Sequence, residues 1–477
     1  MDIHITFDGR RNLSGQIYQQ IREAILDGRL RAGEPLPPTR ELADRIEVSR
    51  NTVTVAYDRL AAEGFVTGRV GAGTFVSGEL HRRPRPRGTV QDGRLRPRAV
   101  WSEIPDLPDL SREPEFDFRP GMPDARLFPY ETWRRLTSRE LRASAVGGAM
   151  YGDPSGHTGL REAIARHIGV SRVVRATGDD ITITNGMQQA LDLAARVLVE
   201  PGMCVAVEDP GYPPVRRLLQ SLGARVTGVP VDAEGLVVDA LPSDARMVYV
   251  TPSHQFPLGM PMSLRRRMAL LDWADRHGAV IVEDDYDSEF RFAGRPIEPL
   301  HSLDHRGLVL YVGSFSKVML PTFRLGFLVS PPSLHRPLRT AKYVSDWHTA
   351  LPMQAALARF IDEGTLARHI RRMRTEYQNR HRLVGRALAG ELGRWLEPVG
   401  AAAGLHVSAY LRDGTHDDVR AVVGRAQKDG VEIYTLGQYA LAKDTRPGLI
   451  LGYGAVPTAR IDEGLGRLRR ALEAQRA

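Results

Sequence analysis

Apolar positions recur at helical spacing in the first part of the chain and predict three helices. Leucine and isoleucine side chains every three or four residues mark a helix over residues 13–27, and Gly28 ends it. A second, short helix is predicted to begin at Thr39, and Ser49 is predicted to cap a third, longer one. Two helices joined by a tight turn form a helix-turn-helix, and the glycine-rich, β-prone segment 64–77 predicts a hairpin wing directly after it.

From residue 115 onward the pattern changes to short apolar runs that alternate with helical periods. This alternation predicts a three-layer α/β domain around a mostly parallel sheet. Ligands bind at the carboxyl ends of the strands in such sheets, and the unusual residues of this chain are concentrated there. The predicted strands are 181–184, 205–208, 247–250, 279–283, 308–312 and 323–329.

Length and composition restrict the class of protein. The 477 residues are enough for two or three domains, each with its own core. A single cysteine excludes a disulfide scaffold and a metal site built from cysteines, and no metal site is predicted. Charged residues interrupt every apolar stretch before it could span a bilayer, and the first residues lack the apolar block of a signal peptide. We therefore expect a soluble, cytoplasmic protein with no membrane partner.

The net charge of +8, from 65 basic and 57 acidic residues, is concentrated in one segment. Residues 81–98 contain seven arginines and one acid, Asp92, and they have almost no large apolar side chains. A segment of this composition cannot bury a core, so we predict a linker over residues 80–115. The linker is either a solvated spacer or an additional contact to a polyanion, as arginine runs beside DNA-binding modules can be.

The third predicted helix has a nucleic-acid signature in its first turn. Arg50, Asn51 and Thr52 lie where a recognition helix directs side chains toward base edges in the major groove. The stretch PLPPTRELADRIEVSRNTV and the glycine wing GAGTFV resemble the GntR family of winged helix-turn-helix domains. The resemblance implies a domain over residues 11–79 that binds a double-stranded DNA operator. The residues that it implies for DNA contact are Arg40, Arg50, Asn51 and Thr52, with Arg69 and Gly73 in the wing.

Two segments at predicted strand ends in the second part carry candidate chemistry. Gly186 lies between a strand and an amphipathic helix, where backbone N–H groups and the positive helix end can bind a phosphate, although such a glycine is usually only a turn. Residues 283–287 contain four acids and follow another strand. Acids in this position are solvated, bind a metal, or face the nitrogen of a heteroaromatic ring.

A third segment carries a lysine in an unusual place. Lys317 follows a predicted strand and precedes apolar residues, and burial there disfavours the ammonium form. A lysine with a lowered pKa can attack an aldehyde and form a Schiff base. Ser314, Ser316 and Arg324 beside it suit a phosphate group. A lysine, phosphate donors and a carboxylate together indicate pyridoxal 5′-phosphate (PLP).

From about residue 116 to 477 the chain resembles the fold type I PLP-dependent aminotransferases, which have a large domain and a smaller C-terminal α+β subdomain. The resemblance implies that Lys317 in GSFSK forms the internal aldimine and that Asp284 keeps the pyridine nitrogen protonated. It also implies that Tyr286 reaches the ring hydroxyl and that Tyr212 stacks on the ring. The other cofactor-binding residues that it implies are Gly186, Met187, Gln188, Ser314, Ser316 and Arg324, with His254 and Gln255 in TPSHQFPLG as neighbours of the cofactor.

The resemblance extends to the assembly. Tyr151 in YGDPSGHTGLREAI matches the tyrosine that reaches the phosphate of the neighbouring subunit in this fold, so a homodimer is implied. A GntR-type domain linked to an aminotransferase-like domain resembles the MocR family of regulators over essentially the whole chain, and the PdxR-like more than the GabR-like members. This implies a transcription regulator that binds PLP, senses a small-molecule effector with its second domain, and forms a head-to-tail dimer.

The chain departs from working transaminases at the substrate side of the predicted site. Phe256 stands before the turn proline, where these enzymes have an asparagine. The closing strand in 447–454 has no arginine to clamp a substrate carboxylate, and the nearest is Arg446. Pro213 and Pro214 follow the stacking tyrosine, where GabR-like members have an arginine. Because a bidentate clamp positions an amino acid for proton abstraction, we expect a site that keeps PLP and need not process amino acids.

Three functions remain open, and we prefer the first. The protein is a regulator whose effector is PLP itself, a regulator that recognises an amino acid or amine through an external aldimine at Lys317, or an aminotransferase with an appended DNA-binding module. The sequence does not decide whether a residual transaminase activity accompanies regulation.

Overall fold

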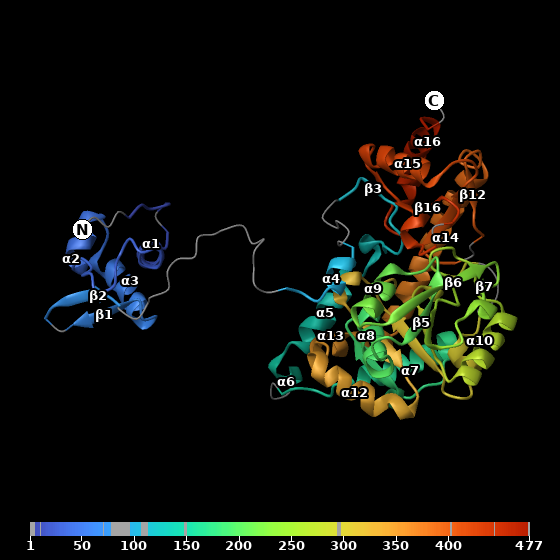
Figure 1. The fold of residues 1–477 in the computed structure, drawn as a ribbon, viewed down its shortest axis with the longest axis horizontal. Helices are drawn as coiled ribbons and strands as arrows, with labels where there is room; N and C mark the ends of the chain where they lie inside the picture. Colours follow the sequence, from blue (N-terminus) through green and yellow to red (C-terminus); the bar gives the residue numbers. More distant parts are fainter. Residues whose placement is uncertain are drawn as a thin grey trace. The chain divides into compact units, whose positions relative to one another are not determined.

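The structure is a computed structural model that describes residues 5–9, 11–69, 71–77, 96–105, 113–146, 150–292, 297–400, 403–442 and 444–475. The chain divides into two compact units, Met1–Pro97 and Arg98–Ala477 (Figure 1). Residues 80–95 and 106–112 of the predicted linker lie outside the described residues.

The first unit is a helix-turn-helix followed by a hairpin, as predicted. Its elements are α1 (Leu13–Leu26), α2 (Thr39–Arg45), α3 (Arg50–Ala62), β1 (Val66–Arg69) and β2 (Gly73–Val76). Ser49 caps α3, because its hydroxyl accepts a 3.1 Å hydrogen bond from the backbone N–H of Thr52. Buried apolar side chains from the three helices and both strands form one cluster, so this unit has its own hydrophobic core.

The second unit contains the predicted mostly parallel sheet. Its eight strands lie in the order β4-β11-β10-β9-β8-β5-β6-β7, and the neighbours from β10 to β6 are parallel. Strand β11 is antiparallel to both of its neighbours, and β7 is antiparallel to β6. The strands are β4 (Ile181–Thr184), β5 (Cys204–Asp209), β6 (Arg225–Asp232), β7 (Gly235–Leu236), β8 (Ala245–Val250), β9 (Val280–Asp285), β10 (Val309–Ser314) and β11 (Gly326–Val329).

Helices cover both faces of this sheet, which confirms the three-layer prediction. Val205 and Val207 of β5 pack in a cluster with side chains of α8 and α9, whereas Cys204 and Ala206 pack in a second cluster with side chains of α10. The same alternation continues through β8, β9 and β10, because successive side chains of a strand point to opposite faces. Adjacent residues at the end of a strand therefore face different helix layers. This applies to the neighbouring acids Asp284 and Asp285 at the end of β9.

The helices of the second unit surround the sheet and lead into the C-terminal part of the chain (Figure 1). They are α4 (Val100–Glu103), α5 (Tyr130–Glu140), α6 (Ala143–Val146), α7 (Thr158–Arg172), α8 (Met187–Leu198), α9 (Pro213–Ser221), α10 (Leu264–His277), α11 (Leu300–Leu303), α12 (Pro332–Asp346), α13 (Leu351–Asp362), α14 (Thr365–Ala389), α15 (His416–Lys428) and α16 (Ile461–Glu473).

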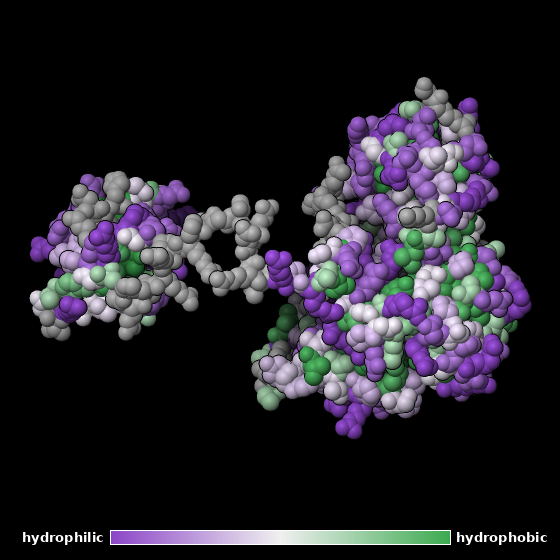
Figure 2. All heavy atoms as spheres, in the orientation of Figure 1, coloured by the Kyte–Doolittle hydropathy of each residue, from purple (hydrophilic) through white to green (hydrophobic). Residues whose placement is uncertain are grey.

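A smaller C-terminal subdomain has its own sheet, with strand order β12-β13-β16-β15. Helices α14 and α15 pack on it, and α16 packs on these two helices. On the face seen in Figure 2 the surface of this subdomain is mainly hydrophilic. The strands here are β12 (Leu396–Pro398), β13 (His406–Leu411), β15 (Tyr434–Thr435) and β16 (Gly448–Gly452), and β14 (Val431–Glu432) pairs with β3 (Phe116–Asp117).

The part of the predicted linker that the structure describes contains helix α4, which was not predicted. A four-residue helix is too short for an apolar period to reveal it. Its Trp101 is 55% exposed. Within the described ranges, no helix is both long enough and apolar enough to cross a membrane.

Candidate functional site

Lys317 lies just beyond the end of β10 and its amine is buried. The Nζ atom donates a 2.8 Å hydrogen bond to the carbonyl oxygen of Gly121. Burial lowers the pKa of the lysine, while the nearby carboxylates of Asp287 and Asp284 act in the opposite direction. A buried amine with a lowered pKa is chemically suited to attack an aldehyde.

Asp284, near the end of β9, has one engaged and one free carboxylate oxygen. Tyr249 donates a 2.6 Å hydrogen bond to Oδ2, and Oδ1 is buried without a partner among the described residues. The side chain is 2% exposed, and burial raises its pKa to about 7. An uncompensated buried carboxylate oxygen is unfavourable, so this position fits the protonated nitrogen of an aromatic ring.

The predicted phosphate-binding residues converge between β4 and α8. Gly186 precedes α8 with φ of 78°, a conformation that favours glycine. A Cβ atom on Gly186 would lie 2.8 Å from Nη2 of Arg324, whose guanidinium donates to the carbonyl of Asn185 at 2.9 Å. The backbone here and the helix N-terminus thus form a cradle beside a guanidinium, as an anion requires.

The two serines meet at the start of the Lys317 segment. Ser314 Oγ donates to Ser316 Oγ at 3.0 Å and accepts from the backbone N–H of Ser316 at 3.1 Å. Gln188, in the first turn of α8, instead donates to the carbonyl of Pro214 at 3.3 Å, so its amide is turned toward α9. The side chain of Met187 packs against the core cluster under α8. Met187 is the first residue of that helix, so its backbone lies at the cradle.

Tyr212 is the N-cap residue of α9 and lies after β5. Its ring meets Phe256 edge to face, with 5.5 Å between the ring centroids. Burial raises the pKa of Tyr212 to about 12. Asp284 raises this pKa further and Arg324 lowers it, which places the tyrosine within electrostatic reach of both ends of the candidate cofactor site.

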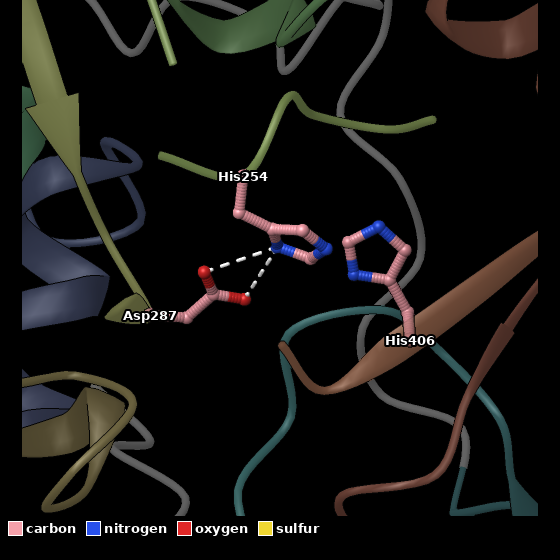
Figure 3. A group of neighbouring side chains, drawn as sticks. All are labelled: His254, Asp287 and His406. Carbon is pink, nitrogen blue, oxygen red and sulfur yellow. Dashed lines mark hydrogen bonds and ion pairs between the residues drawn. The ribbon is translucent and has the colours of Figure 1, made fainter. Parts of the chain in front are cut away.

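Tyr286 contacts a buried group of three side chains, His254, Asp287 and His406 (Figure 3). The Tyr286 hydroxyl lies 2.8 Å from Nδ1 of His254, and the same nitrogen lies 3.0 and 3.1 Å from the two oxygens of Asp287. His406, at the start of β13, donates from Nε2 to the carbonyl of Pro257 at 2.9 Å. The loops after β8 and β9 thereby meet the C-terminal subdomain beside Tyr286.

The two histidines of this group have ring nitrogens that point toward one another (Figure 3). Among the described residues, neither Nε2 of His254 nor Nδ1 of His406 has a hydrogen-bond partner. Burial lowers the pKa of His406 to about 3, so its ring is neutral. Ligand atoms of His254, Asp287 and His406 lie within 4.8 Å of one another, so the group could also hold a metal ion. Metal binding was one of the possibilities for the acidic run that contains Asp287, but no metal site was predicted and the two histidines were not connected with that run.

The side chain of Gln255 forms its hydrogen bonds within and beside the turn that contains it. Its amide donates to the carbonyls of Pro210 and Phe256 at 2.9 and 2.7 Å, and its oxygen accepts from Leu258 N–H at 3.0 Å. It also lies 3.4 Å from Glu208. These contacts position the turn, so Gln255 acts on the site through the backbone that it fixes.

Tyr151 is separated from the residues above. Its side chain is 71% exposed and stacks on Trp347, with 4.2 Å between ring centroids. No contact between Tyr151 and Lys317 or Asp284 occurs in the described part of this chain.

The arginines considered for a substrate clamp have other partners. Arg446 forms a 2.7 Å ion pair with Glu397, and its guanidinium carbon lies 4.2 Å from the ring centroid of Tyr410. Arg216 donates to the carbonyl of Ala440 at 3.4 Å. Strand β16 carries no arginine, as its sequence requires.

The candidate DNA-contacting residues lie on the surface of the first unit. Arg40, Arg50 and Asn51 are exposed, and within the described ranges their side chains form no hydrogen bond or ion pair. The Thr52 hydroxyl lies 2.8 Å from that of Ser49. In the wing, the guanidinium carbon of Arg69 lies 4.8 Å from the ring centroid of Phe75, and Gly73 has φ of 107°.

Several residues of the site had no signal that sequence reasoning could use. Tyr249, Glu208 and His406 meet the predicted residues only through sheet neighbours or the C-terminal subdomain. Asp287 belongs to the acidic run 283–287, but its position next to His254 depends on the turn after β9.

The two units match two known families. Residues 13–76 match the bacterial regulatory proteins of the gntR family, and residues 123–407 match aminotransferase class I and II. The chain is 36% identical to the probable rhizopine catabolism regulatory protein MocR of Rhizobium meliloti, with 96% of this chain and 93% of that protein covered. It is 32% identical to the pyridoxine biosynthesis transcriptional regulator PdxR of Corynebacterium glutamicum, with 92% of this chain and 91% of that protein covered.

The second unit also has solved structural neighbours. The kynurenine aminotransferase of Pyrococcus horikoshii, solved in complex with PMP, matches with a TM-score of 0.70 and 30% identity, covering 76% of this chain and 92% of that one. The second unit therefore has the fold of the PLP-dependent aminotransferases.

Proposed function

Since the chain belongs to the MocR family of transcription regulators, we propose that its second unit binds PLP and that PLP is the signal to which its DNA binding responds. The observation that carries this proposal is the convergence of a buried amine, Lys317, and a buried carboxylate with one free oxygen, Asp284. The two groups influence each other electrostatically, as an amine and a ring-nitrogen partner in one cofactor site would.

The ring end of the cofactor has a defined set of partners in this proposal. PLP supplies an aldehyde that joins the Lys317 amine and a ring that withdraws electrons when its nitrogen is protonated. Asp284 would hold that proton at the ring nitrogen through Oδ1. Tyr286 would contact the ring hydroxyl, with His254 and Asp287 fixing the position of its own hydroxyl. Tyr212 would cover one face of the ring.

The phosphate end would lie at the N-terminus of α8. Gly186 leaves room for it where a Cβ atom would clash with Arg324, and the helix dipole and guanidinium both favour a dianion. Ser314 and Ser316 would supply hydroxyls from the other side.

The same geometry favours sensing over turnover. The substrate carboxylate of an aminotransferase needs a bidentate partner, and Arg446 is instead held by Glu397 and Tyr410. Phe256 presents a ring where a hydrogen-bonding side chain would be needed, and it packs against Tyr212 and Tyr439. These contacts support PLP itself as the effector, with an amino acid or amine as the alternative.

DNA binding is the function of the first unit. We assign base contacts to Arg50, Asn51 and Thr52 in the first turn of α3, and further contacts to Arg40, Arg69 and Gly73. Support comes from the exposure of Arg50 and Asn51 and from the absence of intramolecular partners for them among the described residues.

The regulator would act as a homodimer. Tyr151 is exposed and stacked on Trp347, and it contacts neither Lys317 nor Asp284 within the described part of its own chain, which leaves it available to a second copy. We propose that it reaches the phosphate in the partner's site, in a head-to-tail arrangement.

The test is a DNA titration with and without PLP. Labelled DNA from the region upstream of the gene would be titrated with purified protein at fixed salt, because phosphate contacts make affinity strongly salt-dependent. We expect PLP to change the affinity or the footprint, and Lys317→Ala to abolish the change while leaving PLP-free DNA binding intact. Unchanged DNA binding at saturating PLP occupancy, read from the absorbance of the bound cofactor, would contradict PLP as the signal. A response to one particular amine in that experiment would instead support the alternative.

A further inference from the structure

A cavity lined by apolar and charged side chains lies in the large unit, and none of its lining residues is among those proposed to hold PLP. It has a volume of about 550 Å³ and is lined by α7, α13, α14 and the turn after β9. Five arginines and two acids line it, together with His167, two serines and apolar side chains. The charged residues are Arg166, Arg172, Arg291, Arg371 and Arg374, with Glu289 and Asp362.

Two of these arginines have carboxylate partners. Arg166 forms a 2.8 Å ion pair with Asp362, and Arg172 forms a 2.7 Å ion pair with Asp285. The second pair is almost completely buried, with 10% and 2% of the two side chains exposed. Their positive charges are therefore largely balanced within the protein.

The other three arginines have no ion-pair partner among the described residues, and Glu289 is the one lining acid that remains beside them. The side chains of Arg291, Arg371 and Arg374 form no hydrogen bond or ion pair with any described residue. Nε of Arg291 is fully buried, and burial and the neighbouring Arg172 both lower the pKa of Arg291. The buried nitrogen of this partly buried guanidinium has no acceptor, which is unfavourable, and an anion in the cavity would supply one.

We propose that this cavity is a binding site for a small anion that carries phosphate or carboxylate groups. Arg291 would be its inner contact, and Arg371 and Arg374 on α14 would contact it from the open side. Planar guanidinium groups bind such oxyanions with paired hydrogen bonds, and Ser288 and Ser171 on the same lining offer hydroxyl donors. The cavity is large enough for a small metabolite but not for a folded partner.

An anion bound in this cavity would also be connected with the proposed PLP site through Arg172. Arg172 donates to Asp285 at 2.7 Å and to Ser253 at 2.8 Å. These two residues are the sequence neighbours of Asp284 and His254, which face the proposed PLP site. An anion bound at Arg291 would also lie close to Arg172, which lines the same cavity. It would therefore compete for Arg172 with Asp285, the residue next to the ring-nitrogen partner Asp284.

The experiment is calorimetric titration of the full-length, PLP-saturated protein with pyrophosphate in a phosphate-free buffer. We expect one saturable site per chain. Arg291→Gln and Arg371→Gln should each weaken it by about 10- to 100-fold, the loss of one charge-assisted contact. Arg420→Gln, an exposed arginine on α15, serves as the control and should bind as the unmodified protein does. Circular dichroism of each variant would verify folding.

Two results would overturn the proposal: no saturable heat, or equal pyrophosphate affinity in the two cavity variants and the control. If pyrophosphate does not bind, titration of labelled DNA with the same variants shows whether these arginines contact the DNA backbone instead. Cofactor absorbance is recorded in the same samples, so failure of PLP to bind is seen separately from failure of the anion to bind.

Discussion

Tyr249 donates a 2.6 Å hydrogen bond to Asp284 Oδ2, and this bond leaves the other oxygen of the carboxylate directed into a buried space without a partner. The next pair along the sheet repeats the contact: Tyr311 donates a 2.6 Å hydrogen bond to Asp285 Oδ2. Asp285 also pairs with Arg172, whereas Asp284 has no cationic partner at hydrogen-bond distance in the described residues. Two adjacent acids of β9 therefore have the same tyrosine contact, and each keeps a second buried oxygen without a partner among the described residues. They differ in charge balance, because Asp285 has a cationic partner and Asp284 does not, so Asp284 is the one that suits a protonated ring nitrogen.

Replacing Tyr249 with phenylalanine should weaken PLP binding. The hydroxyl stabilises the charged form of Asp284, so its loss raises the pKa of a carboxyl that burial already raises to about 7. We expect about tenfold weaker PLP binding, equivalent to one hydrogen bond to a charged group. An absorbance titration of the apoprotein with PLP measures this.

The matched control for that variant is Tyr311→Phe, which removes the same bond from Asp285. It should leave PLP affinity within about twofold of the unmodified protein, because Asp285 faces the other layer of the sheet. Equal losses of affinity in the two variants would mean that Tyr249 acts through stability and not through Asp284.

The stability of the PLP-free protein should depend on pH through Asp284. Its folded-state pKa, raised to about 7 by burial, exceeds that of the unfolded chain, so the folded state holds the proton more tightly. Protonated Asp284 therefore contributes to the free energy of unfolding in full below about pH 4, and this contribution is lost as the pH rises through about 7. Urea unfolding at pH 5 and pH 8 should show a decrease of roughly 1–3 kcal/mol from this group.

The comparison that isolates Asp284 is Asp284→Asn, which removes the titrating group. The pKa values of Glu208 and Glu283 are also raised to about 7. The unfolding free energy of the variant should therefore still depend on pH, but less steeply, because the contribution of Asp284 is absent. PLP should have a similar effect, because a protonated ring nitrogen keeps Asp284 ionised in the folded state. An identical pH dependence in the unmodified protein and the Asn variant would show that Asp284 does not titrate in this range.

Much of the fold and the centre of the site could be predicted because they depend on local pattern. Lys317, Asp284 and Gly186 each lie at or just beyond the end of a strand with a clear apolar run, and the carboxyl ends of parallel strands meet at one edge. Strand β6 (Arg225–Asp232) was missed because only one of its residues is buried and it contains glycine and proline.

The surroundings of the site could not be predicted because they depend on contacts between distant segments. Tyr249 reaches Asp284 only because β8 and β9 are neighbours in the sheet. His406 reaches Pro257 across 149 positions of sequence, through the docking of the C-terminal subdomain. The same reason applies to the cavity arginines, which come from α7, α14 and the segment after β9 and share no motif.

Arg50→Ala should reduce sequence discrimination by the first unit. A side chain that contacts a base edge contributes about 1–3 kcal/mol of discrimination, so the ratio of operator to scrambled-DNA affinity should fall by about 5- to 150-fold. Fluorescence anisotropy with both duplexes at one salt concentration measures that ratio.

The control for Arg50 is Arg59→Ala in the same helix. Arg59 lies near the C-terminal end of α3, where it forms a 3.1 Å ion pair with Glu63. Its loss should leave the operator preference unchanged. A uniform loss of affinity for both duplexes on replacing Arg50 would assign that residue to the DNA backbone instead of a base.

The contact of Tyr151 with the partner's site can be tested by mixing two inactive variants. Tyr151→Phe should weaken PLP binding, and Lys317→Ala should abolish covalent attachment of PLP. In a mixed dimer, a tyrosine that acts across the interface restores one complete site, with Lys317 from one subunit and Tyr151 from the other. We expect mixing after mild dissociation to recover tight, borohydride-fixable PLP in up to about a quarter of all sites, since half of the dimers are mixed and each has one intact site. A tyrosine that acts within its own chain restores none, because no subunit in the mixture then carries both residues.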